Sequence, residues 1–368
     1  MKRLKKPSLR KNILRRGRLL ELINRFSLNK RVFIFMFMVF SVILMFEKTT
    51  SVHSETLPMA TNRNAAFDEA EAKIKGTSSW QPSGWGSGEY LTTLPVIKAG
   101  VVLDFETGEV IWSMNLKQKI APASLSKLAT VTTALDIAKG DLPIFIMQTA
   151  ADQIPTKLGL IQGEILRLDE AIAAAVMTSA NDATEAIAHS LGQGLGGGDS
   201  KFMELVNLKL KKLGAVDSNF TTATGLDDSS HYSTIYDLAL VAHNAKVNYP
   251  VVSADAASLY KRLDANQNHK LYDLPNWNAL LGTYPGVDGL KIGYTENAGY
   301  STIVTAARDG KKLMAVVIGA NSIEDREKAA ATLLNYGFEK YGIAAYPVNS
   351  LDLTKRFNDW KEQLTAAN

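Results

Sequence analysis

The chain has 368 residues, of which 46% are hydrophobic and 21% charged, and it contains no cysteine. This composition is globular, and the length allows one large domain or two ordinary ones. The absence of cysteine excludes a thiol nucleophile, a disulfide framework and a thiolate metal site. The net charge of +4 does not indicate nucleic-acid binding, because residues 1–31, with twelve Lys or Arg and one Glu, carry +11 and the remaining chain −7.

The basic stretch is followed by an apolar run, residues 32–46, interrupted only by Ser41. As a helix this run would be about 22 Å long, shorter than the roughly 30 Å hydrocarbon core of a bilayer. It can span if Lys48 extends to the interface, as a signal-anchor, and it also fits the apolar part of a signal peptide cleaved near Ser54. Either way residues 1–31 are expected in the cytoplasm and the rest outside, as a single-pass cell-membrane protein or a secreted one.

Residues 47–94 are predicted to form a linker, with a short helical pattern at 65–74 and a flexible Ser/Gly/Pro-rich stretch at 78–88. Two tryptophans in that stretch, Trp80 and Trp85, could contact glycan. The plainer expectation is that they dock on the domain or stay loose.

Residues 95–345 have the pattern of one α/β domain. Strands at both ends and helices in the middle predict an antiparallel sheet flanked by helices, with an inserted and mostly helical subdomain. Turn signals at Glu106–Glu109 and Asp309–Gly310 predict two hairpins. The strands are expected at 96–105, 110–114, 301–307 and 312–320, and the helices at 123–139, 169–178, 182–191, 200–213 and 329–341.

The C-terminal tail, residues 346–368, has an apolar stripe at helical spacing. Such a stripe can lie on a membrane, but packing against the domain is the more common outcome and is expected here. The stripe consists of Leu353, Phe357, Trp360 and Leu364.

Ser124 and Lys127 form an S-x-x-K pattern at the start of the helix expected at 123–139. A serine becomes a good nucleophile only when a neighbouring base takes its proton, and residues three apart on a helix share a face. Burial can make the lysine neutral and therefore basic. The pattern alone is weak because it recurs, although only Ser124 opens a strong helical pattern. The other occurrences begin at Ser8, Ser27 and Ser258.

Two further patterns carry candidate groups. Ser179-Ala180-Asn181 falls in a break between helices, where a hydroxyl can relay a proton and an amide can hold a substrate peptide bond, although it also suits an N-cap. Lys291-Ile292-Gly293 follows a turn, and its glycine allows close backbone approach while its lysine can attract a carboxylate.

In this order the three patterns resemble those of the serine D-alanyl-D-alanine carboxypeptidases, which are low-molecular-mass penicillin-binding proteins of the β-lactamase/transpeptidase-like superfamily. Neighbouring strings match as well: P-A-S-L-S-K from Pro122, S-A-N-D-A from Ser179, H-Y-S-T from His231 and G-V-D-G-L-K from Gly286. The resemblance covers about residues 95–345. It implies hydrolysis of peptidoglycan stem peptides that end in D-Ala-D-Ala, inhibition by β-lactams, and no metal or other cofactor.

The resemblance also implies residue roles. Ser124 would be the acylated nucleophile, Lys127 its base and Ser179 the proton relay, while the N–H groups of Ser124 and Tyr294 would form the oxyanion hole. Arg326 would face the terminal carboxylate of the substrate, or else be a surface helix arginine. The implied substrate-binding residues are Asn181, Lys291, Gly293, Tyr294, Thr295 and Arg326.

Ile292 departs from the family pattern K-T-G, because it removes a hydroxyl aimed at the substrate carboxylate. Thr295, expected on the same strand face as Lys291, could replace that hydroxyl in part. The alternative is a cell-wall or penicillin-binding protein of the same fold with weakened or lost turnover. A zinc peptidase is disfavoured because the five histidines are scattered, and a serine β-lactamase because no suitable E-x-x-L-N loop occurs.

Overall fold

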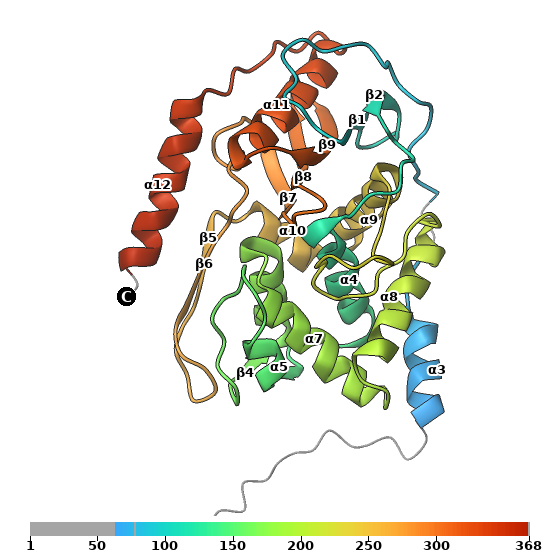
Figure 1. Cartoon of the computed structure of the whole chain (residues 1–368), viewed down its shortest axis with the longest axis vertical. Helices are drawn as coiled ribbons and strands as arrows, with labels where there is room; N and C mark the ends of the chain where they lie inside the picture. The colour runs from blue at the N-terminus through green and yellow to red at the C-terminus, as the bar shows by residue number, and fades with distance from the viewer. Residues whose placement is uncertain (1–62, 77–78, 367–368) are drawn as a thin grey trace, which may run out of the picture. The chain divides into compact units, whose positions relative to one another are not determined.

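The structure, a computed structural model, describes residues 63–76 and 79–366 (Figure 1). The basic stretch and the apolar run predicted at 1–46 lie outside the described residues. Within the described part, no helix is both long and apolar enough to cross a membrane.

The strands are β1 (Ala99–Asp104), β2 (Val110–Met114), β3 (Pro143–Phe145), β4 (Ile165–Arg167), β5 (Tyr260–Leu263), β6 (Tyr272–Pro275), β7 (Val287–Gly293), β8 (Tyr300–Arg308) and β9 (Lys311–Ala320). The helices are α3 (Arg63–Lys73), α4 (Lys127–Ile137), α5 (Gln148–Ala151), α6 (Leu168–Ala173), α7 (Asn181–Gly194), α8 (Asp199–Leu213), α9 (Ile235–Asn248), α10 (Pro250–Ala257), α11 (Ile323–Glu339) and α12 (Ser350–Ala366), with a 3₁₀ turn η2 (Ala123–Ser126) and a π-helical turn η3 (Ala174–Thr178).

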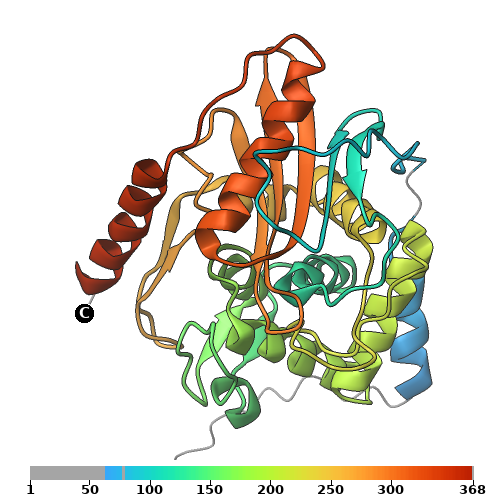
Figure 2. The ribbon, with the colours of Figure 1, turned by 45° about the horizontal axis from the view of Figure 1, so that its top comes forward.

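The main sheet has five antiparallel strands in the order β2-β1-β9-β8-β7, so the first strands of the domain pair with the last. Both faces of the sheet are buried. Val101 and Leu103 belong to the apolar cluster on one face, and Val102, between them, belongs to the cluster on the other. Helix α11 covers one face, and α9 and α10 pack on the opposite face (Figure 2).

Helix α4 is the centre of the helical region and packs against α7, α8 and α9. Its first eight residues, Lys127 to Ala134, are all buried. A helix that is buried on every side needs polar groups only where they serve a purpose, and two of these, Thr130 and Thr132, donate to backbone carbonyls. Among the buried polar groups of α4, Thr133 Oγ1 has no hydrogen-bond partner.

The predicted α/β fold is confirmed. The two expected hairpins are β1–β2 and β8–β9, and the inserted region between β2 and β7 is mostly helical. The helix predicted at 123–139 differs in one respect, because it begins as the 3₁₀ turn η2 before α4 starts at Lys127. The serine of the S-x-x-K pattern therefore lies in the tighter turn.

The predicted linker differs from expectation in the part that the structure describes, because it packs on the domain. The C-terminal end of α3 is bound by Lys209, whose buried Nζ donates to Lys75 O at 3.2 Å, Asp136 Oδ2 at 2.7 Å and Tyr249 Oη at 2.6 Å. Paired in this way, a buried ammonium holds three segments together. Residues 63–76 are thus fixed to the helical region.

Residues 79–90, which we call the N-terminal strap, run beside β2 rather than hanging free. Ser83 and Ser87 form parallel bridges with Glu109 and Trp112. The Trp80 indole N–H donates to Phe105 O at 2.9 Å, so this tryptophan docks on the domain, whereas Trp85 is 69% exposed.

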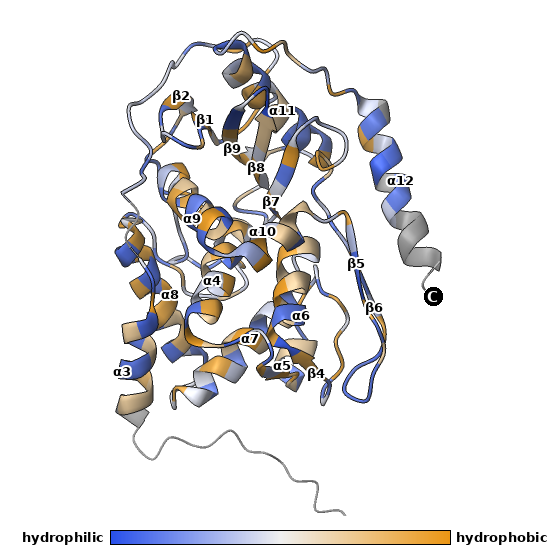
Figure 3. Cartoon of the chain, turned by 180° about the vertical axis from the view of Figure 1, so that it is seen from behind, coloured by the Kyte–Doolittle hydropathy of each residue, from blue (hydrophilic) through white to orange (hydrophobic). Residues whose placement is uncertain are grey.

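Helix α12 packs against the domain, as expected. Leu353 is fully buried, and Trp360 stacks on Trp277 with ring centroids 6.1 Å apart. The coloured part of α12 and the turn of the β5–β6 hairpin are largely hydrophilic (Figure 3). The predicted boundaries at residues 95 and 345 remain predictions.

Candidate active site

Ser124 lies in η2 and Lys127 begins α4, and both side chains are buried. The Lys127 Nζ lies 2.7 Å from Ser124 Oγ. The spacing of three residues places the two groups on one side of the turn, as the sequence predicts. They are in direct hydrogen-bond contact.

Lys127 Nζ has two further partners, and both are carbonyl oxygens. It donates to Asn181 Oδ1 at 2.8 Å and to the backbone carbonyl of Thr224 at 2.5 Å. Carbonyl oxygens accept hydrogen bonds and cannot donate them. When the amine is neutral, its two hydrogens satisfy these carbonyls and its lone pair is left toward Ser124, whose hydroxyl has a proton to give. The contacts therefore fix the direction of proton transfer.

Burial favours that neutral form. Desolvation lowers the pKa of Lys127 from its ordinary value of 10.5 to about 7, and the negative charges of Asp182 and Glu185 oppose part of this shift. Near neutral pH a large share of the amine is thus unprotonated and able to act as a base.

Ser179 and Asn181 lie where the helical run from Leu168 is interrupted. The turn η3 ends at Thr178, the following Ser179 has φ 59° in the left-handed region, and α7 begins at Asn181. The Asn181 carboxamide is fixed at both ends, because its Nδ2 donates to Ile154 O at 2.9 Å while its Oδ1 accepts from Lys127. This confirms the predicted break and orients the amide oxygen toward the base.

Strand β7 brings the third pattern against the nucleophile. A Cβ on Gly293 would lie 3.0 Å from Ser124 N and 3.1 Å from Ala123 Cβ, so any larger residue would push the strand or η2 by a few tenths of an ångström. Lys291 is buried, and its Nζ donates to Ile292 O at 3.0 Å. Desolvation, followed by the positive charges of Lys127 and Arg326, lowers its pKa.

Comparison with known proteins identifies the family. A family profile described as D-alanyl-D-alanine carboxypeptidase (Peptidase_S11) matches residues 94–322. The chain belongs to this family. It is 30% identical over 249 residues to the D-alanyl-D-alanine carboxypeptidase DacF of Bacillus subtilis, covering 66% of this chain and 62% of the relative. It is 31% identical over 264 residues to DacD of Salmonella typhimurium, covering 67% of this chain and 64% of the relative.

This S11 family member spans less than two thirds of the length of those relatives. Its fold is also similar to that of a solved DD-transpeptidase from Streptomyces K15, with a TM-score of 0.63 and 24% identity over 67% of this chain and 100% of that chain. At that identity the likeness concerns the fold alone.

Two predicted residues of the S11 site, Tyr294 and Thr295, lie beyond the end of β7. Tyr294 follows β7 and is 51% exposed, with its ring 4.4 Å from that of Tyr300. The expectation that Thr295 shares a strand face with Lys291 is wrong, because β7 ends at Gly293 and the Thr295 hydroxyl accepts Ala298 N–H in the following turn. Short polar side chains commonly close such turns in this way.

The expectation that Arg326 is a surface helix arginine is wrong, because only 3% of it is exposed and its guanidinium is bonded to Glu327 Oε1 and to Trp277 O. An arginine buried at the start of α11 needs such a counter-ion. Its charge still acts on Lys291, as the pKa of that lysine shows. Its role toward the terminal carboxylate of the substrate stays a prediction.

One contributor to the S11 site could not be read from the sequence. The Thr224 carbonyl that holds Lys127 also accepts from Ser124 Oγ at 3.4 Å. Its segment fits against η2 because Gly225, at φ +80°, has no Cβ, and one would lie 2.2 Å from Ala123 O. A backbone carbonyl leaves no residue-type signal, and only the glycine hinted at the close contact.

His231, in one of the matching strings, supports the same segment. Its ring Nδ1 accepts the N–H groups of Thr221 and Thr222 at 3.1 and 3.3 Å.

Among the described residues, no three His, Asp or Glu side chains are grouped so that they could hold a metal ion.

We predict that Lys127 titrates near pH 7. Its ordinary ammonium form is destabilised because burial removes its hydration. The measurement is the ¹³Cε shift of labelled lysines between pH 5 and 11, with Lys127→Gln assigning the resonance. Finding every lysine protonated at pH 9 would contradict the prediction.

Proposed function

We propose that this protein is a serine-type D-Ala-D-Ala carboxypeptidase, a peptidase and hydrolase that acts on peptidoglycan stem peptides through an acyl-enzyme on Ser124. The observation that carries the proposal is the contact of Ser124 Oγ with a buried Lys127 whose other hydrogens are committed to Asn181 and Thr224. A base held in this way activates a serine without a metal or cofactor. Membership of the S11 family supports the substrate class.

In acylation, neutral Lys127 takes the proton of Ser124, and Oγ attacks the carbonyl carbon of the penultimate D-Ala. The N–H groups of Ser124 and Tyr294 stabilise the oxyanion. The C–N bond then breaks, and the amine of the terminal D-Ala leaves with a proton passed from Lys127 through Ser179, the role that the family resemblance implies for this serine. Water hydrolyses the Ser124 ester in a second cycle and restores the hydroxyl. β-Lactams, which resemble D-Ala-D-Ala, would acylate the same Oγ.

We predict that Ser124→Ala abolishes covalent labelling by a fluorescent penicillin, because no other hydroxyl contacts Lys127 Nζ among the described residues. Ser258→Ala is the matched control, since it has the same S-x-x-K pattern but caps α10 and bonds to Tyr260 O. Labelling is read by gel fluorescence and peptide mapping, with circular dichroism to verify folding. Retained labelling in the Ser124 variant would refute the assignment.

Ile292 supports a second candidate, a wall-binding protein of weakened turnover. The two groups that could compensate for the missing hydroxyl are each partly engaged, since Thr295 Oγ1 accepts Ala298 N–H and Arg326 is paired with Glu327. The terminal carboxylate of the substrate would then lose one hydrogen bond near Lys291. Such a loss weakens an enzyme without eliminating its activity.

We predict that Ile292→Thr raises kcat/KM for a D-Ala-D-Ala peptide. A hydrogen bond to a charged group contributes about 1.5–3 kcal/mol, or about tenfold to a hundredfold in rate. Ile292→Val, which removes bulk but adds no donor, serves as the control for packing. Equal gains in both variants would show that space rather than hydrogen bonding limits the reaction, and absence of turnover in all three proteins would favour the binding-protein candidate.

We also propose that the protein is held at the cell membrane through its N-terminal segment, with the catalytic domain outside and residues 1–31 inside. The support is the sequence alone: +11 before the apolar run 32–46 and −7 over the rest of the chain. Cleavage near Ser54 would instead release the domain.

We predict that protease added to intact spheroplasts digests the catalytic domain, because the positive stretch stays on the cytoplasmic side. An antibody against the domain follows its loss, and a cytoplasmic protein serves as the control for lysis. Full protection of the domain would rule out this topology. The domain in the culture supernatant would indicate cleavage.

A further inference from the structure

The loop at residues 153–163, between α5 and β4, is bonded to the Ser179–Asn181 pattern along its length. Thr156 O accepts Asn181 N–H at 2.8 Å, and Ile154 O accepts Asn181 Nδ2 at 2.9 Å. The Thr156 hydroxyl donates to Ser179 O at 3.2 Å. Asn181 is therefore oriented by this loop on one side and by Lys127 on the other.

Asp182 anchors the loop. Its carboxylate is fully buried and accepts the N–H groups of Leu158 at 3.0 Å, Gly159 at 2.8 Å and Leu160 at 3.0 Å, together with Ala183 N–H at 2.9 Å. Four N–H donors and the N-terminus of α7 compensate the charge without a hydrogen-bonded cation. One side chain thus joins the loop to the helix turn that carries Asn181.

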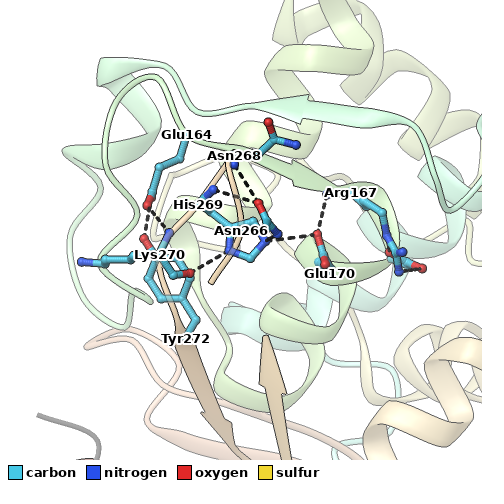
Figure 4. Close-up of polar contacts among 9 residues, drawn as sticks. Glu164, Arg167, Glu170, Asn266, Asn268, His269, Lys270 and Tyr272 are labelled. Carbon is cyan, nitrogen blue, oxygen red and sulfur yellow. Dashed lines mark hydrogen bonds and ion pairs between the residues drawn. The ribbon is translucent and has the colours of Figure 1, made fainter. Parts of the chain in front are cut away.

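The far end of the loop is held by a second carboxylate (Figure 4). Glu164 accepts the Tyr272 hydroxyl at 2.5 Å, Ile161 N–H at 2.8 Å and Lys270 N–H at 3.1 Å. Tyr272 lies on β6, and its hydroxyl is also 3.3 Å from Gly159 O, in the stretch whose N–H groups Asp182 accepts. Glu164 and Tyr272 thus hold the same loop without a hydrogen bond to Lys127.

We propose that Asp182 is a positioning residue of acylation, which holds loop 153–163 against Ser179–Asn181 so that Asn181 and Lys127 keep their contact. The proposal rests on the proposed function of Ser124. Asp182 directly follows the Ser179-Ala180-Asn181 pattern in the sequence, and the proposal gives it a role of its own. It also distinguishes Asp182 from Glu185, one turn further along α7, for which the structure gives no hydrogen bond to the loop.

The negative charge of Asp182 also affects the pH dependence of acylation. Asp182 and Glu185 act on Lys127 from α7 and raise its pKa, while Lys291 on β7 and His231 are the basic groups on which Lys127 in turn acts. Removing either carboxylate charge lowers the pKa of Lys127. Because neutral Lys127 is the base, acylation then reaches its plateau at lower pH.

The test compares full-length wild type, Asp182→Asn and Glu185→Gln. The rate of acylation by a fluorescent penicillin is measured from pH 5 to 9. In Asp182→Asn an N–H₂ group replaces one carboxylate oxygen and cannot accept hydrogen bonds from the backbone N–H groups of the loop. We therefore expect the plateau rate of acylation to fall at least about tenfold, and the midpoint of its pH profile to shift to lower pH because the negative charge is lost. Glu185→Gln should shift the midpoint in the same direction with its plateau within about twofold of wild type, because it leaves the loop bonds in place.

Amide hydrogen exchange at Leu158, Gly159 and Leu160 gives a readout that needs no activity. Protection should be lost in Asp182→Asn and kept in Glu185→Gln. An unchanged plateau, unchanged protection, or a lower plateau without a shift of midpoint would overturn the proposal. If wild type itself is not acylated, the proposed function fails, and the exchange result still decides whether Asp182 holds the loop.

If Asp182→Asn does not fold, Tyr272→Phe provides the second variant. It loosens the same loop at Glu164 without changing a charge near Lys127. We expect a plateau rate lowered by about twofold to tenfold and an unmoved midpoint. A plateau equal to that of wild type would show that the loop does not position the site.

Discussion

The geometry of the site depends on an amine that is buried and yet completely hydrogen-bonded. Lys127 is one of the largest fully buried side chains described, and an isolated ammonium in that place would be costly. Three acceptors compensate its protonated form, and two of them remain satisfied when it is neutral. The pocket of carbonyls therefore tolerates both protonation states, which a base must visit in each catalytic cycle.

The acceptors come from three separate segments, and this explains much of the surrounding packing. The turn η2 at the start of α4 supplies Ser124, α7 supplies Asn181, and the segment before α9 supplies Thr224. Bringing a helix start, a helix interruption and an irregular segment within hydrogen-bond distance requires close backbone contacts. Gly225 and Gly293 provide them, since a Cβ at position 225 would collide with η2 and one at position 293 would press tightly against it.

The sequence predicted several regular elements because their signals are local, whereas helices α9 and α10 were not predicted. The alternation of Val101 to Leu103 between the two buried faces of the sheet and the turn at Asp309–Gly310 reflect periodicity and turn chemistry that neighbouring residues determine. The three site patterns were also readable, since Ser124, Lys127 and Asn181 act through their side chains. What could not be predicted acts through the backbone or through distant pairing. The Thr224 carbonyl has no residue-type signature, and the burial of Arg326 depends on Glu327 and on Trp277, some fifty positions away in the chain.

The N-terminal strap covers an exposed edge of the main sheet and so affects how the domain meets other molecules. β2 is the edge strand on that side of the sheet, and its free backbone groups would offer a template to any neighbouring molecule. The strap occupies them instead: Ser83 N–H and Ser87 N–H donate to Gly108 O and Ile111 O, and Val110 N–H donates back to Ser83 O. This covering segment precedes residue 94, where the match to the family profile begins. Protection against edge-to-edge aggregation is thus encoded in residues that contribute nothing to the catalytic signature, and a domain trimmed to that signature would lose it.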